Sequence, residues 1–417
     1  MTVRFRGRRP MPAIVCARAA LPLLLAGLLA SPAAARHAHN QSSKAASKAD
    51  RAGSLDLDRE TVAKAEFSGK QPSEGKISAL ALRLQVLLAR AHFSPGEIDG
   101  KFGENARKAL QAYCDAQDLF SCDRLTQDAW SKLAADDRPV LTEYRISDQD
   151  LAGPFVRRIS AKMEEEKALP NLGYTSPREE LAEKFHMSED LLAALNPGET
   201  FDQAGHNILV VDPGEDGDAP KAARVEVDKD QQTVKVFGND DHLVDFYPAT
   251  VGSEEKPSPI GKLRVTEIQR HPTYHYNPKY HFKGVQATSP FTINAGPNNP
   301  VGSVWIGLSD EGYGIHGTPD PGKVSKAQSH GCVRLTNWDA ERLASEVKKG
   351  TPVAFVDPAG EQRNAFGKTA LRSRPPEDVR GADRPMIANQ GRTGGQAQAG
   401  SQLSVPPTGR SSSLQAR

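Results

Sequence analysis

The chain carries almost no net charge. Its 417 residues include 53 lysines and arginines and 52 aspartates and glutamates, which leaves a formal net charge of +1. Such a balance produces no field that would favour nucleic acid or an anionic membrane. We therefore expect no nucleic-acid partner, and other partners must be identified from local sites.

The apolar run near the N-terminus lacks the length of a membrane span. Residues 20–30 fall well short of the roughly 20 residues that a spanning helix needs. Arginines precede the run, and Ala33, Ala34 and Ala35 follow it. This order predicts a secretory signal peptide over residues 1–35 rather than a membrane anchor. We expect an exported, periplasmic protein with no integral membrane segment after cleavage.

Cysteine is scarce, with four residues in the chain. Cys16 would be lost with the signal peptide, which leaves Cys114, Cys122 and Cys332 in an oxidising compartment. Cys114 and Cys122 are close enough in sequence to form a local disulfide, and two buried reduced thiols are the alternative. Cys332 then stays unpaired, and a spare thiol in an exported protein is a liability unless it has a chemical role.

A linker and a small helical domain are expected next. Residues 36–75 show no sustained apolar periodicity and are predicted to be the linker. Within residues 76–136, apolar residues recur at helical spacing around Leu84, Leu110 and Trp130, which predicts three short helices. The segment resembles the peptidoglycan-binding type 1 domain through Gly-Glu-Ile-Asp-Gly-Lys-Phe-Gly at residues 96–103. A helical spacer is the alternative.

A connector over residues 137–173 should lead to a second module at residues 174–213. Leu181, Leu191 and their neighbours predict two short helices, with a strand before them and a closing strand at residues 207–211. The segment resembles a LysM glycan-binding module through residues 181–188 and Leu-Asn-Pro-Gly at 195–198. A purely structural module is the alternative.

Strand periodicity begins at residue 224 and continues to residue 357. Short apolar runs between turn signals predict strands around Val225 and Val234 and in residues 243–251, 263–268, 304–307, 314–316 and 353–356. One helix should begin with Thr336 as its N-cap and end at Gly350. Residues 358–417 have few large apolar residues and are expected to form a disordered tail.

Cys332 lies in the run Ser-His-Gly-Cys-Val-Arg at residues 329–334. A thiol attacks as the thiolate, so it needs a proton acceptor nearby, and His316 at the end of a predicted strand is the candidate base. The backbone N–H groups of Gly331 and Cys332 are expected to form an oxyanion hole. Arg334 is the expected cation for a substrate carboxylate. This pattern predicts a nucleophilic enzyme.

At these residues the sequence resembles the L,D-transpeptidase family with its YkuD-type catalytic domain. The resemblance covers residues 224–357 and includes residues 258–261, 296–302, His-Gly-Thr at 316–318, and residues 329–334. It implies a mainly-β, β-sandwich-like catalytic domain with one helix after the catalytic cysteine. The whole chain is then multidomain, with a small α-helical bundle and a LysM-like α+β module before that domain.

The resemblance also implies the roles of the site residues. Cys332 would be the acylated nucleophile, His316 the general base, and the Gly317 carbonyl the group that orients His316. Ser329, His330 and Arg334 would shape the pocket. For His330, a role in fixing the loop is the alternative to direct catalysis.

The implied reaction cleaves the L,D peptide bond of a peptidoglycan tetrapeptide and transfers the acyl group to an acceptor amine, which forms a 3-3 cross-link. Attachment of an envelope protein to peptidoglycan is one alternative, and stem trimming by hydrolysis is another. A non-catalytic wall-binding scaffold is the rival from a different class. Peptidoglycan is the expected partner, and no cofactor is required.

Three histidines raise a further alternative, a zinc site formed by His271, His275 and His281. Their surroundings predict no helix that would align such ligands, and no glutamate stands in a general-base position. We therefore expect no metal. The aromatic-rich segment at residues 268–290 is instead expected to cover part of the substrate groove.

Overall fold

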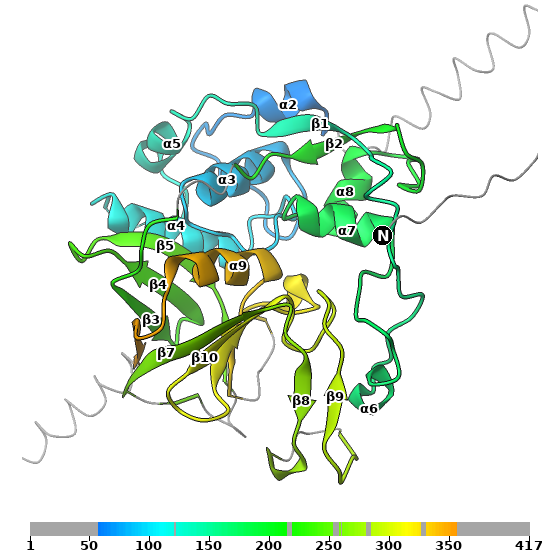
Figure 1. Cartoon of the computed structure of the whole chain (residues 1–417). Helices are drawn as coiled ribbons and strands as arrows, with labels where there is room; N and C mark the ends of the chain where they lie inside the picture. The colour runs from blue at the N-terminus through cyan, green and yellow to red at the C-terminus, as the bar shows by residue number, and fades with distance from the viewer. Residues whose placement is uncertain are drawn as a thin grey trace, which may run out of the picture. The chain divides into compact units, whose positions relative to one another are not determined.

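The computed structural model describes residues 57–120, 122–214, 219–252, 258–259, 261–280, 285–326 and 331–356 (Figure 1). The expected signal peptide and the expected tail lie outside the described residues. Across these described ranges, no helix has both the length and the apolar character needed to cross a membrane.

The helices and strands follow one another in an uneven order, with most helices before residue 200. The helices are α2 (Arg59–Ala63), α3 (Ala79–Arg90), α4 (Glu104–Ala116), α5 (Gln127–Leu133), α6 (Met163–Glu166), α7 (Pro177–Lys184), α8 (Glu189–Leu195) and α9 (Asn337–Glu346). The strands are β1 (Leu141–Arg145), β2 (Asn207–Val211), β3 (Arg224–Asp228), β4 (Thr233–Phe237), β5 (Leu243–Pro248), β6 (Thr250–Val251), β7 (Gly261–Arg270), β8 (Tyr274–Tyr276), β9 (Phe291–Ile293), β10 (Val304–Leu308), β11 (Gly314–His316), β12 (Val333–Arg334) and β13 (Pro352–Val356).

Helices α3, α4 and α5 lie where the apolar periodicity predicts them. The side chain of Ser78 caps α3, and the side chain of Thr126 caps α5, each by accepting a backbone N–H of the first turn. Gln85, buried on α3, holds the turn that follows the helix: its Nε2 donates to Asp99 and its Oε1 accepts from Gly100 N. The glycine-rich turn is thereby fixed against the helix.

The predicted linker over residues 36–75 is wrong for its second half. Leu57, Val62 and Phe67 are buried, and Val62 lies on the short helix α2. Trp130 Nε1 donates to Glu66 at 2.7 Å, which ties this segment to α5. The five-residue α2 is too short to show the apolar periodicity on which sequence reasoning depends.

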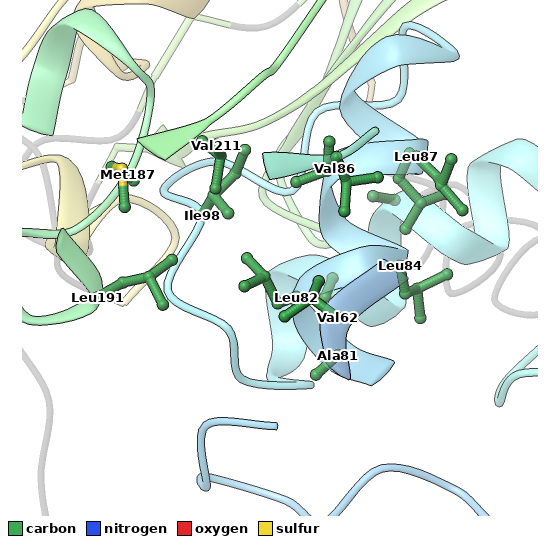
Figure 2. Packing of buried hydrophobic residues seen from close by; sticks show 14 of the residues in the cluster. Val62, Ala81, Leu82, Leu84, Val86, Leu87, Ile98, Met187, Leu191 and Val211 are labelled. Carbon is green, nitrogen blue, oxygen red and sulfur yellow. The ribbon is translucent and has the colours of Figure 1, made fainter. Parts of the chain in front are cut away.

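One hydrophobic core joins the helical domain to the second module. Figure 2 shows Val62 and Leu84 gathered with Ile98, Leu191 and Val211. Strand β1 pairs with β2 in antiparallel register across the second module, so the opening strand comes from residues 141–145. The sequence pattern predicts the opening strand after residue 174, directly before the two helices of the module. The true strand lies in the expected connector.

A disulfide links Cys114, in the last turn of α4, to Cys122. Both cysteines are fully buried, and Cys332 forms no disulfide. The structure therefore contains the pairing that the cysteine spacing favours, and it leaves a single thiol in the strand-rich part of the chain.

A nine-stranded sheet in the order β5-β4-β3-β13-β7-β10-β11-β12-β6 forms the strand-rich part. Its two edge strands, β5 and β6, are separated in the chain by Ala249 alone, so the sheet must curl back on itself like a barrel. The predicted mainly-β architecture is confirmed. The sheet and α9 enclose a second apolar cluster that includes Val227, Ile306 and Leu343.

Helix α9 begins as the sequence predicts. Thr336 is the N-cap, and its Oγ1 accepts from Asp339 N at 3.2 Å. The predicted end at Gly350 is wrong, because the helix stops at Glu346 with extended backbone at Val347. Gly350 has φ +92° and shapes the turn that leads into β13.

The edge strand β5 is covered by residues from the helical domain. Ser94 N donates to Phe246 O at 2.9 Å, and Phe246 N donates to His92 O at 3.0 Å. The ring of Phe246 belongs to the apolar core of the helical domain rather than to that of the sheet. The sheet and the upstream domain are therefore joined by backbone hydrogen bonds and by shared core packing.

Candidate active site

Two short parallel strands place Cys332 near His316. Strand β11 pairs with β12, with Ile315 opposite Val333 and His316 opposite Arg334. Cys332 immediately precedes β12, so the crossover between the two strands returns it to the strand that carries His316. The thiol is partly exposed, and its Sγ lies 3.7 Å from Gly312 O. Residues distant in sequence thus meet at one point of the sheet.

His316 is buried, and its tautomer is fixed by a backbone carbonyl. Its Nδ1 lies 2.6 Å from Gly317 O. Because a carbonyl oxygen can only accept, Nδ1 carries the proton and Nε2 of the neutral ring keeps its lone pair. The ring also stacks on Trp305, with centroids 5.7 Å apart. The imidazole is held in one orientation with a free acceptor nitrogen.

Burial lowers the pKa of His316 to about 3. The nearby charge of Arg334 acts in the same direction, whereas the hydrogen bond to Gly317 opposes it. Desolvation disfavours the imidazolium form. In the protein without substrate, the His316 ring is therefore neutral throughout the physiological pH range.

A cavity of about 440 Å³ contains both side chains. Arg334 supplies a half-buried cation there, and burial lowers its pKa from the ordinary value while the charge of Cys332 opposes that shift. The lining residues come from the sheet, the β8 segment and the connector: Met163, Glu267, Gln269, Pro272, Thr273, Tyr274, His275, Pro300, Val301, Trp305, Glu311, Gly312, His316, Cys332 and Arg334.

The turn before Cys332 is supported from another predicted motif. Gly331 has φ +101°, a conformation that favours glycine, and Ser258 Oγ donates to its carbonyl oxygen at 2.8 Å. Ser258 is buried, and it opens the Ser-Pro-Ile-Gly run. Ser329 and His330 lie outside the described residues.

The segment after β7 forms a wall of the cavity, as the sequence predicts. Residues 272–275 line the cavity, and β8 pairs with β9 in an antiparallel hairpin (Figure 1). The connector adds Met163, which sequence reasoning missed, since no motif marked it. Glu164 next to it accepts from the backbone N–H groups of Gln286 and Ala287, so connector and hairpin segment are held together.

The histidines of the zinc alternative have other surroundings. The two ring nitrogens of His275 lie 2.9 Å from Thr292 Oγ1 and 3.1 Å from Thr273 Oγ1. Among the residues that the structure describes, no group of three histidines, cysteines or acidic residues is placed to hold a metal ion. His281 lies outside them. His275 is instead part of the cavity wall.

Asn337, the first residue of α9, is a buried site residue that sequence reasoning missed. Its Oδ1 accepts the backbone N–H groups of Ser303 and Thr318, each at 3.1 Å. A Cβ on Gly317 would lie 2.2 Å from this oxygen, so only glycine fits beside it. Asn337 directly follows the N-cap of α9, and nothing in the sequence connects it to the His-Gly-Thr motif.

Comparisons of the sequence with known proteins identify the family of the strand-rich domain. Residues 222–354 match the YkuD family, the L,D-transpeptidase catalytic domain. The chain is 30% identical over 178 residues to the Bacillus licheniformis protein named L,D-transpeptidase YkuD. The alignment covers 43% of this chain and 92% of the relative. It is 28% identical over 198 residues to L,D-transpeptidase YbiS of Escherichia coli K12, with 44% and 61% covered.

A solved L,D-transpeptidase from Mycobacterium smegmatis aligns with 32% of this chain and 57% of that chain, at 19% identity and a TM-score of 0.27. The sequence relatives carry the assignment. The family match and these relatives show an enzyme with a YkuD-type catalytic domain. The chain belongs to the L,D-transpeptidase family.

The neutral state of His316 predicts the acid side of the pH profile. With the pKa of His316 at about 3, lowering the pH from 8 to 5 does not protonate the ring. We expect the rate of modification of Cys332 by a β-lactam to show no decline centred near pH 6.5, the ordinary pKa of histidine. Stopped-flow acylation rates between pH 5 and 9 measure this, and a decline centred near 6.5 contradicts it.

Proposed function

We propose that Cys332 is the nucleophile of this L,D-transpeptidase and His316 its general base. The observation that carries the proposal is a thiol outside any disulfide that shares a cavity with a buried imidazole, whose Nδ1 proton is held by the Gly317 carbonyl. Because Nδ1 is the donor, Nε2 is the nitrogen that accepts the thiol proton. No carboxylate is needed for this arrangement, since the Gly317 carbonyl takes the orienting position.

The proton moves to His316 as the sulfur attacks, rather than beforehand. Burial and Arg334 both disfavour an imidazolium in the free enzyme. The sulfur attacks the carbonyl carbon of the L,D peptide bond, and the N–H groups of Gly331 and Cys332 stabilise the resulting oxyanion. His316 then returns its proton to the departing amine of the terminal D-Ala. A thioester on Cys332 remains.

The donor stem is held by its carboxylate at Arg334. A half-buried guanidinium beside the nucleophile offers a charge-assisted, bidentate contact, which is among the strongest that a protein makes to a carboxylate. Ser329 and His330 complete the pocket, as the family resemblance implies. The pairing of Arg334 with His316 across β11 and β12 sets the distance between the bound stem and the base.

An acceptor amine resolves the thioester in preference to water. Tyr274, His275 and Met163 form a wall of the cavity beside Cys332, and apolar and aromatic groups there exclude water from the reacting bond. The favoured product is a 3-3 cross-link between peptidoglycan stems. Attachment of a protein amine is the second outcome, and release of a tripeptide is the hydrolytic one.

The two upstream modules bind the wall in this proposal. Residues 76–136 resemble the peptidoglycan-binding type 1 domain, and the unit of α7, α8 and β2 resembles a LysM module, now with β1 as its opening strand. Peptidoglycan is the partner of both. Export to the periplasm follows from the expected signal peptide.

Acylation by a carbapenem tests the nucleophile, because a β-lactam presents a strained amide to the thiol. We expect one adduct on the parent protein and none on Cys332→Ala in intact-protein mass spectra. Cys332→Ser is the matched control, because it keeps a side chain of similar size and removes only the thiol. Replacing His316 by Ala should slow the reaction by roughly 10²–10⁴-fold. An adduct of equal yield on Cys332→Ala would remove Cys332 from the mechanism.

Wall binding is measured by sedimentation of the Cys332→Ala protein, which cannot form a thioester, with insoluble peptidoglycan. We expect the protein in the pellet with peptidoglycan and in the supernatant with cellulose. Excess soluble tetrapeptide should not release it, because the binding is assigned to the modules rather than to the cavity. A protein that stays in solution, or that soluble stem peptide displaces, argues against the role given to the modules.

Product analysis separates transfer from hydrolysis. With a disaccharide-tetrapeptide donor and excess acceptor, we expect dimers to exceed free tripeptide in the mass spectrum. Tyr274→Phe keeps the ring in the cavity wall and should preserve this ratio, whereas Tyr274→Ala opens the wall and should shift products toward tripeptide. Tripeptide as the sole product of the parent protein at every acceptor concentration would make it a hydrolase.

A further inference from the structure

The carboxamide of Asn337 fixes the backbone that orients His316. Its Oδ1 receives the N–H groups of Ser303 and Thr318, and it fills the space left by two glycines. A Cβ on Gly302 would lie 2.1 Å from this oxygen, and one on Gly317 would lie 2.2 Å from it. The peptide unit between Gly317 and Thr318 thus has a fixed N–H, and its carbonyl is the one that receives the Nδ1 proton of His316.

Glu183 holds the other end of this carboxamide. Asn337 Nδ2 donates to Pro297 O at 3.2 Å and lies 3.2 Å and 3.1 Å from the two carboxyl oxygens of Glu183. Glu183 belongs to α7, which is part of the upstream module and not of the catalytic sheet. It is one contact through which that module reaches the residues around His316, and on the same helix Glu179 accepts from Asn298 Nδ2.

We propose that Glu183 is a positioning residue for His316, acting through Asn337 and the Gly317 carbonyl. This inference rests on the proposed function, in which His316 is the general base. The upstream module then has a part in the chemistry besides its role in wall binding.

The carboxamide of Asn337 can take two orientations, and a hydrogen-bond acceptor at residue 183 favours the one observed. The two ends of a carboxamide differ only in hydrogen bonding, since one offers an acceptor and the other offers donors. Glu183 and Pro297 present oxygens to one end, while Ser303 and Thr318 present N–H groups to the other. Removing the oxygens of Glu183 leaves Pro297 O as the one acceptor among the described residues for the NH₂ end, so the carboxamide is held less firmly in its present orientation and position. A flipped amide would place its NH₂ against two N–H groups.

A flipped or displaced carboxamide moves the Gly317 carbonyl away from Nδ1. His316 then loses the bond that selects its tautomer, and Nε2 is no longer reliably the acceptor. A catalytic group misplaced by about 1 Å can cost about 10²-fold in rate. Binding of the reagent in the cavity does not depend on this bond, so the effect should fall on the chemical step.

The test uses the full chain and a carbapenem, with the acylation rate followed over a range of reagent concentrations. Glu183→Met fills a similar volume without an acceptor, and Glu183→Gln keeps one carbonyl oxygen. We expect Glu183→Met to lower the maximal acylation rate by about 10–100-fold and to change the half-saturating concentration by less than about twofold. Glu183→Gln should stay within about threefold of the parent.

Glu180→Met is the matched control, because Glu180 lies on the same helix and the hydrogen bonds of Asn337 go elsewhere. It should acylate at the parent rate. Thermal unfolding monitored by circular dichroism identifies any variant that is not folded, and Glu183→Ser replaces Glu183→Met if the latter is unfolded.

The outcomes are distinct. A Glu183→Met protein that reacts at the parent rate overturns the inference, and so does equal slowing of Glu183→Met and Glu183→Gln. An increase in half-saturating concentration alone also overturns it, because positioning of the base acts on the maximal rate. A parent protein without an adduct on Cys332 would instead refute the proposed function itself.

Discussion

The hydrogen bond from His316 Nδ1 to Gly317 O is the interaction on which the rest of the site depends. It decides which ring nitrogen is free, in a ring too buried to hold a proton by itself. The carbonyl is adjacent in sequence to the ring that it orients, so the backbone around it must be rigid. Parallel pairing of β11 with β12 holds one side, and the carboxamide of Asn337 holds the other.

The absence of a carboxylate at this bond changes the electrostatics of the base. In a triad, an ionised aspartate stabilises the imidazolium that forms during the reaction. Here a neutral carbonyl stands in that place, and Arg334 adds a positive charge nearby. The imidazolium form of His316 is therefore disfavoured, which in the proposed mechanism promotes return of the proton to the leaving amine. In the proposed mechanism, the cation that binds the donor carboxylate adds to the effect of burial in disfavouring the imidazolium of His316.

Local sequence signals predicted much of the catalytic domain. Strands such as β3, β4 and β10 have alternating or continuous apolar residues between turns, and Thr336 has the chemistry of an N-cap. Strands β8, β9 and β12 were missed because strands of two or three residues rarely show a period, and the equally short β11 is the exception. Cys332 and His316 were identified through their motifs, but the strand pairing that brings them together could not be read from spacing alone.

Contacts between distant residues account for the other differences. The pairing of β1 with β2 and the contact of Glu183 with Asn337, 154 residues apart, leave no periodic trace in the sequence. An Asn after a helix cap is common, and a Glu on a polar helix is ordinary. Their importance arises only when the fold buries one against the other. Motif-based reasoning therefore found the residues to which the proposal gives catalytic roles, and it missed the residues that contact the backbone around them.

The cover over β5 has a consequence for how the chain can be divided. An uncovered sheet edge offers unpaired N–H and C=O groups to any other strand, and such edges promote aggregation. Residues 92–94 occupy this edge, and the Phe246 ring fills a hydrophobic site outside its own sheet. A fragment beginning at Arg224 would present both a bare edge and an exposed aromatic ring to the solvent. The sequence looks modular, but its folding unit includes the helices before the sheet.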